Sequence, residues 1–489
     1  MSIFRKKSLA ALLDQASHST LKRTLTAQSL VALGVGAIIG AGLFIRTAAA
    51  ATEASGPAVT LSFIIAAIGC VFAGLCYSEF AAMIPIAGSA YTYAYTTMGE
   101  LVAWIIGWAL VLEYALGAAT VAIGWSEYLN NLLGGNIPFQ WCHSPMQVSA
   151  AGVHGIFNLP ALFIVLLLTI LLVKGTQESA NVNAVIVALK VAIVIAFIVV
   201  GWHFVRPANL SPYMIPAGIP GHEGTFQHGW GGILGGAGIV FFAFIGFDAV
   251  STAAQETKKP ERDMPIGILG SLAVCTVLYI LFAYVLTGVC NWREFAVAGK
   301  EASVAFAVQN YMPGFHWLGT AITVAILLGF SSVILVMLLG QSRVFYTMAS
   351  DGLLPKLFSD IHPKFRTPYK CNIILFFFVG AFAAVVPGDV AGDLTSIGTL
   401  FAFTLVSIGV WIMRHLEPTM KRPFRTPFVP LVPILGVIVC GGMIASLGHR
   451  TQLTALVWML IGLAIYFLYG RTHSQLKPQA LEVTEKAVQ

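Results

Sequence analysis

The chain has 489 residues, of which 57% are hydrophobic and only 10% are charged, and its mean hydropathy is +0.84. Soluble proteins carry about 25% charged residues, so this composition excludes a soluble globular fold and predicts an all-α protein that is embedded in the membrane. The net charge of +6 is explained by the orientation of such a protein, so we expect no nucleic-acid partner.

Twelve apolar segments follow one another along the chain, separated by boundaries rich in proline and glycine. A helix of about 20 apolar residues crosses the hydrocarbon core, and helices that are apolar on all sides are recognised by length rather than by periodicity. The predicted spans are 28–53, 57–82, 98–132, 159–174, 178–205, 230–252, 266–290, 317–348, 371–387, 393–415, 430–448 and 453–470.

The basic residues between these spans predict the orientation. With the N-terminus in the cytoplasm, 21 of the 27 lysines and arginines fall on the cytoplasmic side, five fall outside, and Lys190 lies within a span. Basic residues concentrate on the cytoplasmic side of membrane proteins. We therefore expect a cytoplasmic N-terminal segment, 1–27, and a cytoplasmic tail, 471–489. The expected location is a cell membrane, the inner membrane in a bacterium.

The first span contains an unusual density of glycine at 34–44, GVGAIIGAGLF. Glycines this close together weaken a helix, and broken backbone in a bilayer is tolerated only where it is buried in protein or lines a water-filled cavity. A broken membrane helix therefore indicates a binding site for a polar solute. The alternative is close helix packing through small residues.

The sixth span repeats this feature at 235–248, GGAGIVFFAFIGFD. Spans 1–5 (28–206) and spans 6–10 (230–416) then form two halves, and an odd number of helices in each half makes the halves inverted in the membrane. The last two spans lie in 430–470, outside the repeat. Broken helices at matching positions of inverted halves are typical of a transporter site.

The broken helices also suggest a ligand, because one half-helix exposes amide donors and the other exposes carbonyl acceptors. A zwitterionic α-amino acid satisfies both groups at once. The predicted donors to its carboxylate are the amides of Gly40, Ala41 and Gly42. The predicted acceptors for its ammonium group are the carbonyls of Ile38, Phe242, Ala243 and Ile245.

Lys190 lies in the middle of the fifth span. A lysine in the hydrocarbon region is costly unless it is solvated, paired or neutral, and a buried lysine changes its protonation state readily. These properties predict a proton-coupling switch. The alternative is a permanent ion pair with Glu113 of the third span, and the two interpretations are compatible because such a partner would tune the lysine.

The sequence contains no paired carboxylates, metal-ligand spacing or nucleophile–base motif, and its seven cysteines are scattered singly. We therefore expect no enzymatic activity and no cofactor or metal, with the proton as the coupling ion. Cys142 lies in a predicted outer loop and Cys290 at the outer end of the seventh span, so a disulfide between them is the alternative, but free thiols are the expectation.

Further motifs lie at 21–25, 77–85, 87–95, 241–265, 341–355 and 422–425. Together with 34–44, they resemble the cationic amino acid transporter branch of the amino acid–polyamine–organocation (APC) superfamily. The resemblance implies the leucine-transporter fold, with ten core helices in two inverted repeats plus two additional helices, and transport by alternating access.

The resemblance also suggests roles for individual residues. In proton-coupled relatives a lysine of span 5 stands where sodium-coupled relatives bind an ion against spans 1 and 8. Lys190 matches that lysine, and Ser331 and Ser332 lie on the span-8 side.

Two positions depart from the family pattern: Ala41, where many relatives have Ser or Thr, and Ala109, where relatives often have an acidic residue. Phe330 is expected to close the side-chain end of the pocket, which favours small or medium neutral substrates, with cationic substrates as an alternative.

These observations predict a monomeric, proton-coupled symporter that imports L-amino acids across the lipid bilayer. One alternative is an exchanger of amino acids or amines without net proton coupling. The other is a sensor that binds an amino acid without transporting it.

Overall fold

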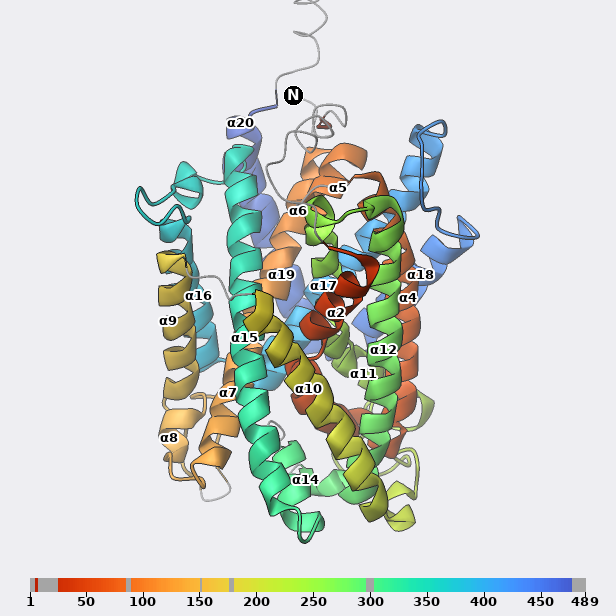
Figure 1. Cartoon of the computed structure of the whole chain (residues 1–489), viewed down its shortest axis with the longest axis vertical. Helices are drawn as coiled ribbons and strands as arrows, with labels where there is room; N and C mark the ends of the chain where they lie inside the picture. The colour runs from red at the N-terminus through yellow and green to blue at the C-terminus, as the bar shows by residue number, and fades with distance from the viewer. Residues whose placement is uncertain are drawn as a thin grey trace, which may run out of the picture.

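The computed structural model describes residues 5–7, 25–84, 89–149, 152–175, 180–295 and 303–476. Apart from two isolated β-bridges, these residues form helices and loops without strands, as the sequence predicts. Most of the predicted N-terminal segment and the tail beyond 476 lie outside the described residues. The helices form one bundle, mostly aligned with its long axis (Figure 1).

Helices occur within all twelve predicted ranges. Their bounds are α2 (Ala27–Ile38), α4 (Val59–Met83), α6 (Glu100–Val111), α7 (Gly117–Leu132), α9 (Leu159–Lys174), α10 (Ala180–Gly201), α11 (Gly229–Val240), α12 (Pro260–Val289), α15 (His316–Ser350), α16 (Tyr369–Val385), α17 (Gly388–Leu416), α18 (Leu431–Ser446) and α19 (His449–Ile465). Short helices include α3 (Thr47–Ala50), α5 (Ser89–Thr97), α14 (Ser303–Tyr311) and α20 (Arg471–His473).

Two predicted helix starts are too late. α12 begins at Pro260 rather than near 266: Pro260 takes the first helical position, where its missing N–H costs no hydrogen bond, and Pro265 lies inside the helix, where it leaves the carbonyl of Glu261 without its helical donor. α17 begins at Gly388 rather than 393, directly after Pro387. Pro265 thus lies inside a helix, whereas Pro387 directly precedes one.

Among the described residues, seven helical segments are long and apolar enough to cross a membrane, and five more apolar helices have 10–17 residues. Two of the shorter helices, Ala27–Ile38 and Gly229–Phe244, belong to the predicted first and sixth spans. Their shortness follows from interruptions inside these two spans.

The described ends of the chain lie at the same end of the bundle (Figure 1). Arg5 donates from Nη1 to the carbonyl oxygen of Leu476 at 2.9 Å and pairs with Glu100 at 3.3 Å. Glu79, near the end of α4, accepts from Nε and Nη2 of Arg414 at 2.8 Å each and from the amide of Thr426 at 2.8 Å. This buried carboxylate therefore ties α4 to α17 and to the linker that follows α17.

Candidate functional site

The first break lies where the glycine pattern predicts it. α2 ends at Ile38, Ile39 takes an extended conformation, and Gly40 is also outside the helix. The chain then continues through a π-helical turn, Gly42–Arg46, into α3. Local π-helix is frequent at functional sites because it leaves the ordinary backbone hydrogen-bond pattern.

The second break lies later in the sixth span than its glycines suggest. α11 is followed by a 3₁₀ turn, Phe241–Phe244, then by a bend at 245–247 and a 3₁₀ segment, Asp248–Glu256. Gly246 has φ +116°, a conformation that favours glycine. The break within the predicted stretch 235–248 is confirmed, but it does not lie at the glycines 235–238.

Those glycines allow α11 to pack closely against neighbouring segments. A Cβ on Gly235 would lie 2.1 Å from the carbonyl oxygen of Phe226, and one on Gly236 would lie 2.5 Å from Oγ of Ser62. Small residues allow this approach, which is the packing alternative for glycine-rich membrane helices.

The two breaks touch each other. A Cβ on Gly42 would lie only 2.2 Å from Cα of Ala243, so the backbones meet without room for a side chain. Tyr279 of α12, which is fully buried, bridges the same two segments. Its hydroxyl oxygen is 2.9 Å from the carbonyl oxygen of Ile38 and 3.0 Å from that of Ala243.

The Tyr279 bridge involves two of the four carbonyls predicted to bind an ammonium group. A phenol has one hydrogen to donate, so it cannot fully satisfy two carbonyl oxygens at once. Sequence reasoning missed Tyr279, although a tyrosine inside an apolar span needs a buried hydrogen-bond partner. That requirement is the signal that could have identified it.

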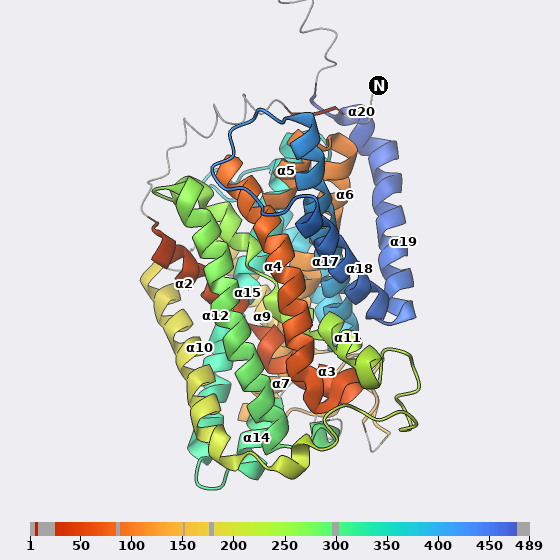
Figure 2. The same ribbon diagram turned by 90° about the vertical axis from the view of Figure 1, so that its right-hand side faces the viewer.

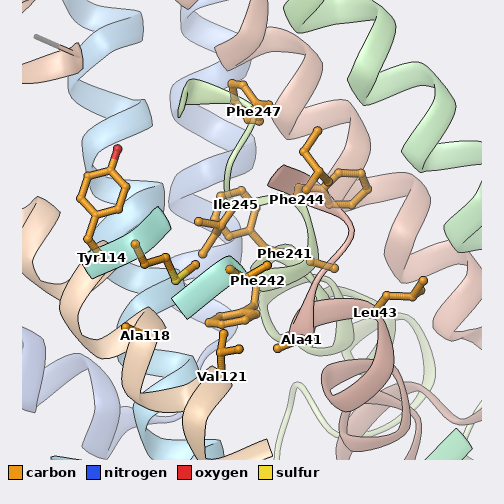
Figure 3. Close-up of a cluster of buried hydrophobic side chains, with 14 of the residues drawn as sticks. Ala41, Leu43, Tyr114, Ala118, Val121, Phe241, Phe242, Phe244, Ile245 and Phe247 are labelled. Atoms are coloured by element: carbon orange, nitrogen blue, oxygen red, sulfur yellow. The ribbon is translucent and has the colours of Figure 1, made fainter. Parts of the chain in front are cut away.

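Apolar side chains fill the space around the breaks. Ala41, Phe242, Ala243 and Phe330 are all buried. In Figure 3, Phe242 lies between the first span, which carries Ala41, and α7, which carries Val121. The predicted binding groups are thus brought together at one place, with side chains packed against one another.

A cavity of about 150 Å³ adjoins the breaks on the side of the chain termini. Of the predicted substrate-binding residues, only Ile245 lines it. The other lining residues that matter for its chemistry are Gly36, Ala37, Tyr114, Gly246, Ser332 and Met337.

Aromatic side chains close the opposite side of the breaks. The ring of Phe330 lies 6.3 Å from that of Phe44 and 5.8 Å from that of Tyr128. The hydroxyl groups of Tyr128 and of Ser303 in α14 donate to the carbonyl oxygen of Phe44 at 3.1 and 3.2 Å. Phe330 therefore lies in the layer that separates the breaks from the far end of the bundle.

Arg46 lies just beyond this layer and is only 1% exposed. It pairs with Asp393 of α17 and donates to the carbonyl oxygen of Asp389 at 3.4 Å. Arg46 is one of the five basic residues that the span boundaries place on the outer side. The structure instead buries it as a link between the first broken helix and α17.

Lys190 is 4% exposed and lies against the helices of the first and eighth predicted spans. Its Nζ donates to the carbonyl oxygen of Gly36 in α2 at 3.1 Å. On the other side, a Cβ on Gly329 of α15 would lie 2.7 Å from Cε of Lys190. Ser332 lines the cavity beside Gly36, whereas the hydroxyl of Ser331 donates to Leu327 within its own helix at 2.9 Å.

Glu113 belongs to a different cluster. Both its carboxyl oxygens are buried and have no hydrogen-bond partner among the described residues, so the predicted pair with Lys190 is absent. Asp248 lies close enough to interact electrostatically with Glu113, and it accepts from the hydroxyl of Tyr114 at 2.9 Å. Glu113 thus faces a second carboxyl group behind the cavity-lining Tyr114.

All seven cysteines are free and buried. Burial raises the pKa of Cys142, which lies in a loop, to about 12, so this thiol resists ionisation. Within the described part of the chain, no group of three or more His, Cys, Asp or Glu side chains is arranged to hold a metal ion.

Comparison with known proteins identifies the family. A family model described as amino acid permease matches residues 25–470. The chain belongs to the amino acid permease family of the APC superfamily. The permease is 44% identical to a branched-chain amino acid permease of Bacillus subtilis (strain 168), over 97% of this chain and 99% of the relative.

Two further relatives differ in their described substrates. The permease is 41% identical to a methylthioribose transporter of the same B. subtilis strain, over 97% of this chain and 99% of the relative. It is 35% identical to the vacuolar cationic amino acid transporter 4 of Arabidopsis thaliana, over 97% and 96%. Membership of the family therefore supports transport across a membrane without selecting one substrate.

The contact between the breaks gives a test of the permease site. Gly42→Ala inserts a methyl group against the backbone of Ala243, and we expect it to lower the free energy of unfolding by about 1–3 kcal/mol and to weaken substrate binding. The measurements are the thermal midpoint of the purified protein and amino acid binding. Gly442→Ala in α18 is the matched control, because nothing lies within 4 Å of its added Cβ. A Gly42→Ala protein with the stability and binding of the wild type would contradict the observed contact.

Proposed function

We propose that this permease imports neutral aliphatic L-amino acids together with protons by alternating access. The observation that carries the proposal is the contact between two broken helices beside a buried lysine that binds the first of them. The relative described as a branched-chain amino acid permease supports the substrate class.

The proposed architecture is the leucine-transporter fold with twelve spans. Its first inverted repeat is 28–206, its second is 230–416, and 430–470 adds two helices. Helix breaks in the first and sixth spans support this arrangement, as does the shared position of the chain ends, which an even number of spans requires. The charge bias supports cytoplasmic termini, and we propose a monomer in a cell membrane, the inner membrane in a bacterium.

We propose that the substrate binds across the two breaks. The amides of Gly40, Ala41 and Gly42 hold its carboxylate, because they follow the end of α2 where the helix restarts. Its ammonium group donates to the carbonyls of Ile38 and Ala243, which share the single hydrogen of Tyr279. An ammonium group has three hydrogens and can therefore complete this arrangement.

The side-chain end of the site favours an uncharged substrate. The cavity is lined mainly by apolar groups, its described lining includes no carboxyl group, and the carboxyl group of Asp248 accepts from the hydroxyl of the lining residue Tyr114. Cavities of about 150 Å³ lined by apolar groups accept molecules of the size of benzene. A leucine or valine side chain meets both conditions, whereas a cationic side chain lacks a partner on the cavity wall.

Lys190 is the proposed coupling group. A charged ammonium donates a stronger hydrogen bond to the carbonyl of Gly36 than a neutral amine does. Protonation therefore strengthens the attachment of α2 to α10, and loss of the proton weakens it. This difference gives the proton control over movement of α2, the helix that ends at the first break.

Replacing Lys190 tests coupling separately from binding. We expect Lys190→Ala to reduce uptake driven by an inward proton gradient by at least about tenfold, while exchange between internal and external amino acid is partly retained. Both activities are measured in proteoliposomes. Lys174→Ala, at the exposed end of α9, is the control and keeps both activities. Undiminished gradient-driven uptake by Lys190→Ala would refute this role and favour the structural interpretation.

Replacing Tyr279 tests where the ammonium group binds. Tyr279→Phe leaves the carbonyls of Ile38 and Ala243 without their donor, so we expect the free energy of unfolding to fall by about 1–3 kcal/mol. Saturating L-leucine then raises the thermal midpoint more in the variant than in the wild type, since the ligand supplies the missing hydrogens. Tyr284→Phe in the same helix is the control, because the hydroxyl of Tyr284 makes no hydrogen bond within the described residues. If L-leucine raises the thermal midpoint of Tyr279→Phe and of the wild type by the same amount, the ammonium group binds elsewhere.

A further inference from the structure

A second, larger cavity lies far from the broken helices. It has a volume of about 520 Å³ and lies where α17 ends and the linker 417–430 leads to α18. Its charged lining residues are Arg414, Arg422 and Arg425, together with the titratable His415. Both views of the bundle show α18 at its outside, and Figure 2 shows the linker at the end that carries the N-terminus and α20.

Three arginines line this pocket, and the carboxylate of Glu79 pairs with two of them, Arg414 and Arg422. Glu79 accepts two hydrogen bonds from Arg414 and lies 3.3 Å from Nε of Arg422. The terminal nitrogens of Arg422 donate instead to backbone carbonyls of its own linker and of α17, including that of Glu417 at 2.7 Å and that of Met413 at 3.0 Å. Burial, together with the positive charges of Arg414 and Arg425, lowers the pKa of Arg422, although Glu79 opposes this change.

Arg425 is the cation that remains available. Its side chain is exposed, and its guanidinium makes no hydrogen bond with the described residues. His415 uses Nδ1 toward the carbonyl oxygen of Trp411 at 3.0 Å, which leaves Nε2 for another partner. The pocket therefore offers a planar fork of donors suited to phosphate, next to two arginines already fixed in place.

Exposed large apolar side chains occur on the pocket wall, next to it in the sequence and further along α18. Phe428 is 80% exposed, and its φ of +48° lies in the left-handed region, which is rare for a bulky residue. Leu431, at the start of α18, is 54% exposed, and Ile438, two turns further along the helix, is 61% exposed. Trp411, which lines the pocket, is also exposed, and tryptophan is enriched where headgroups meet hydrocarbon.

We propose that this pocket binds the headgroup phosphate of an anionic phospholipid, with the acyl chains lying along the exposed face of α18. Basic pockets at the cytoplasmic ends of membrane helices suit anionic lipid headgroups. A water-soluble phosphate compound would use the arginines alone, whereas a phospholipid bound there would also contact apolar side chains next to the pocket, Phe428 and Leu431. A lipid covers both the charged and the apolar part of the surface.

The test measures lipid binding to the full-length purified protein by native mass spectrometry. Phosphatidylglycerol is compared with phosphatidylcholine, which has the same acyl chains and no net charge. We expect preferential retention of phosphatidylglycerol, and Arg425→Gln weakens it about fivefold, as loss of one interfacial cation predicts. Lys421→Gln, which removes an exposed cation of the same linker outside the pocket, changes binding less than twofold. Equal retention of the two lipids, or equal effects of the two substitutions, would overturn the proposal.

A second comparison separates a lipid from a soluble anion. Phe428→Ser removes the apolar border without touching the arginines, and we expect it to weaken phosphatidylglycerol binding while binding of inorganic phosphate stays the same. If phosphatidylglycerol binds to Phe428→Ser as it does to the wild type, and inorganic phosphate displaces it completely, the pocket is a site for soluble anions. That result would overturn the lipid assignment even if Arg425 proves essential.

Discussion

Backbone groups that a broken helix leaves unpaired must find partners inside the protein, because the hydrocarbon region offers none. Most of the central features of this permease follow from that constraint. The carbonyls of Gly36, Ile38, Phe44 and Ala243 surround the two breaks, and each accepts from a side chain of another element. Lys190, Tyr128 and Tyr279 are these donors. The breaks are therefore held by side chains of other helices, and the proposed mechanism lets a substrate replace, or a change of protonation weaken, these contacts.

The surroundings of the breaks differ on their two sides. Toward the far end of the bundle, the rings of Phe44, Phe330 and Tyr128 pack together, and the buried pair of Arg46 and Asp393 lies beyond them. Toward the chain termini, the cavity lined by Gly36, Tyr114 and Ser332 adjoins the breaks. The structure is closed on one side and hollow on the other, as expected for one state of an alternating-access transporter. With cytoplasmic termini, the closed side faces outward.

The sequence predicted those parts of the site that depend on local composition. Clustered glycines located the first break to within a few residues, because glycine weakens a helix wherever it occurs. In the sixth span the break lies within the predicted stretch 235–248, but the glycines at 235–238 instead allow close packing against Ser62 and Phe226. A glycine has the same local effect in either role, and only the neighbouring elements decide between them.

Residues whose importance depends on distant partners were harder to predict. Tyr279 and Arg46 act through carbonyl or carboxylate groups from other helices, and no pattern near either residue indicates that partner. Lys190 was identified because a charge within an apolar span is conspicuous without knowledge of its neighbours. Its acceptor, the carbonyl of Gly36, was not identified, and the proposed partner Glu113 proved to face Asp248.

The relatives of the permease show that one framework serves different solutes, which fits recognition through backbone groups with a variable side-chain pocket. Here the pocket wall is apolar, while two separate clusters carry charge: Lys190 beside α2, and Glu113 with Asp248 behind Tyr114. In the proposed mechanism, the lysine against the first break links the charge state of the protein to the position of the helix that forms the proposed substrate site. This link is the central claim of the proposed mechanism.

The most direct test is uptake of labelled L-leucine into proteoliposomes in sodium-free buffer, with and without an inward proton gradient. Proton symport predicts accumulation above the external concentration that depends on the gradient and disappears when a protonophore collapses it. Leucine movement that requires internal amino acid and ignores the gradient would contradict symport. It would identify the permease as an exchanger in which Lys190 only holds α2 in place.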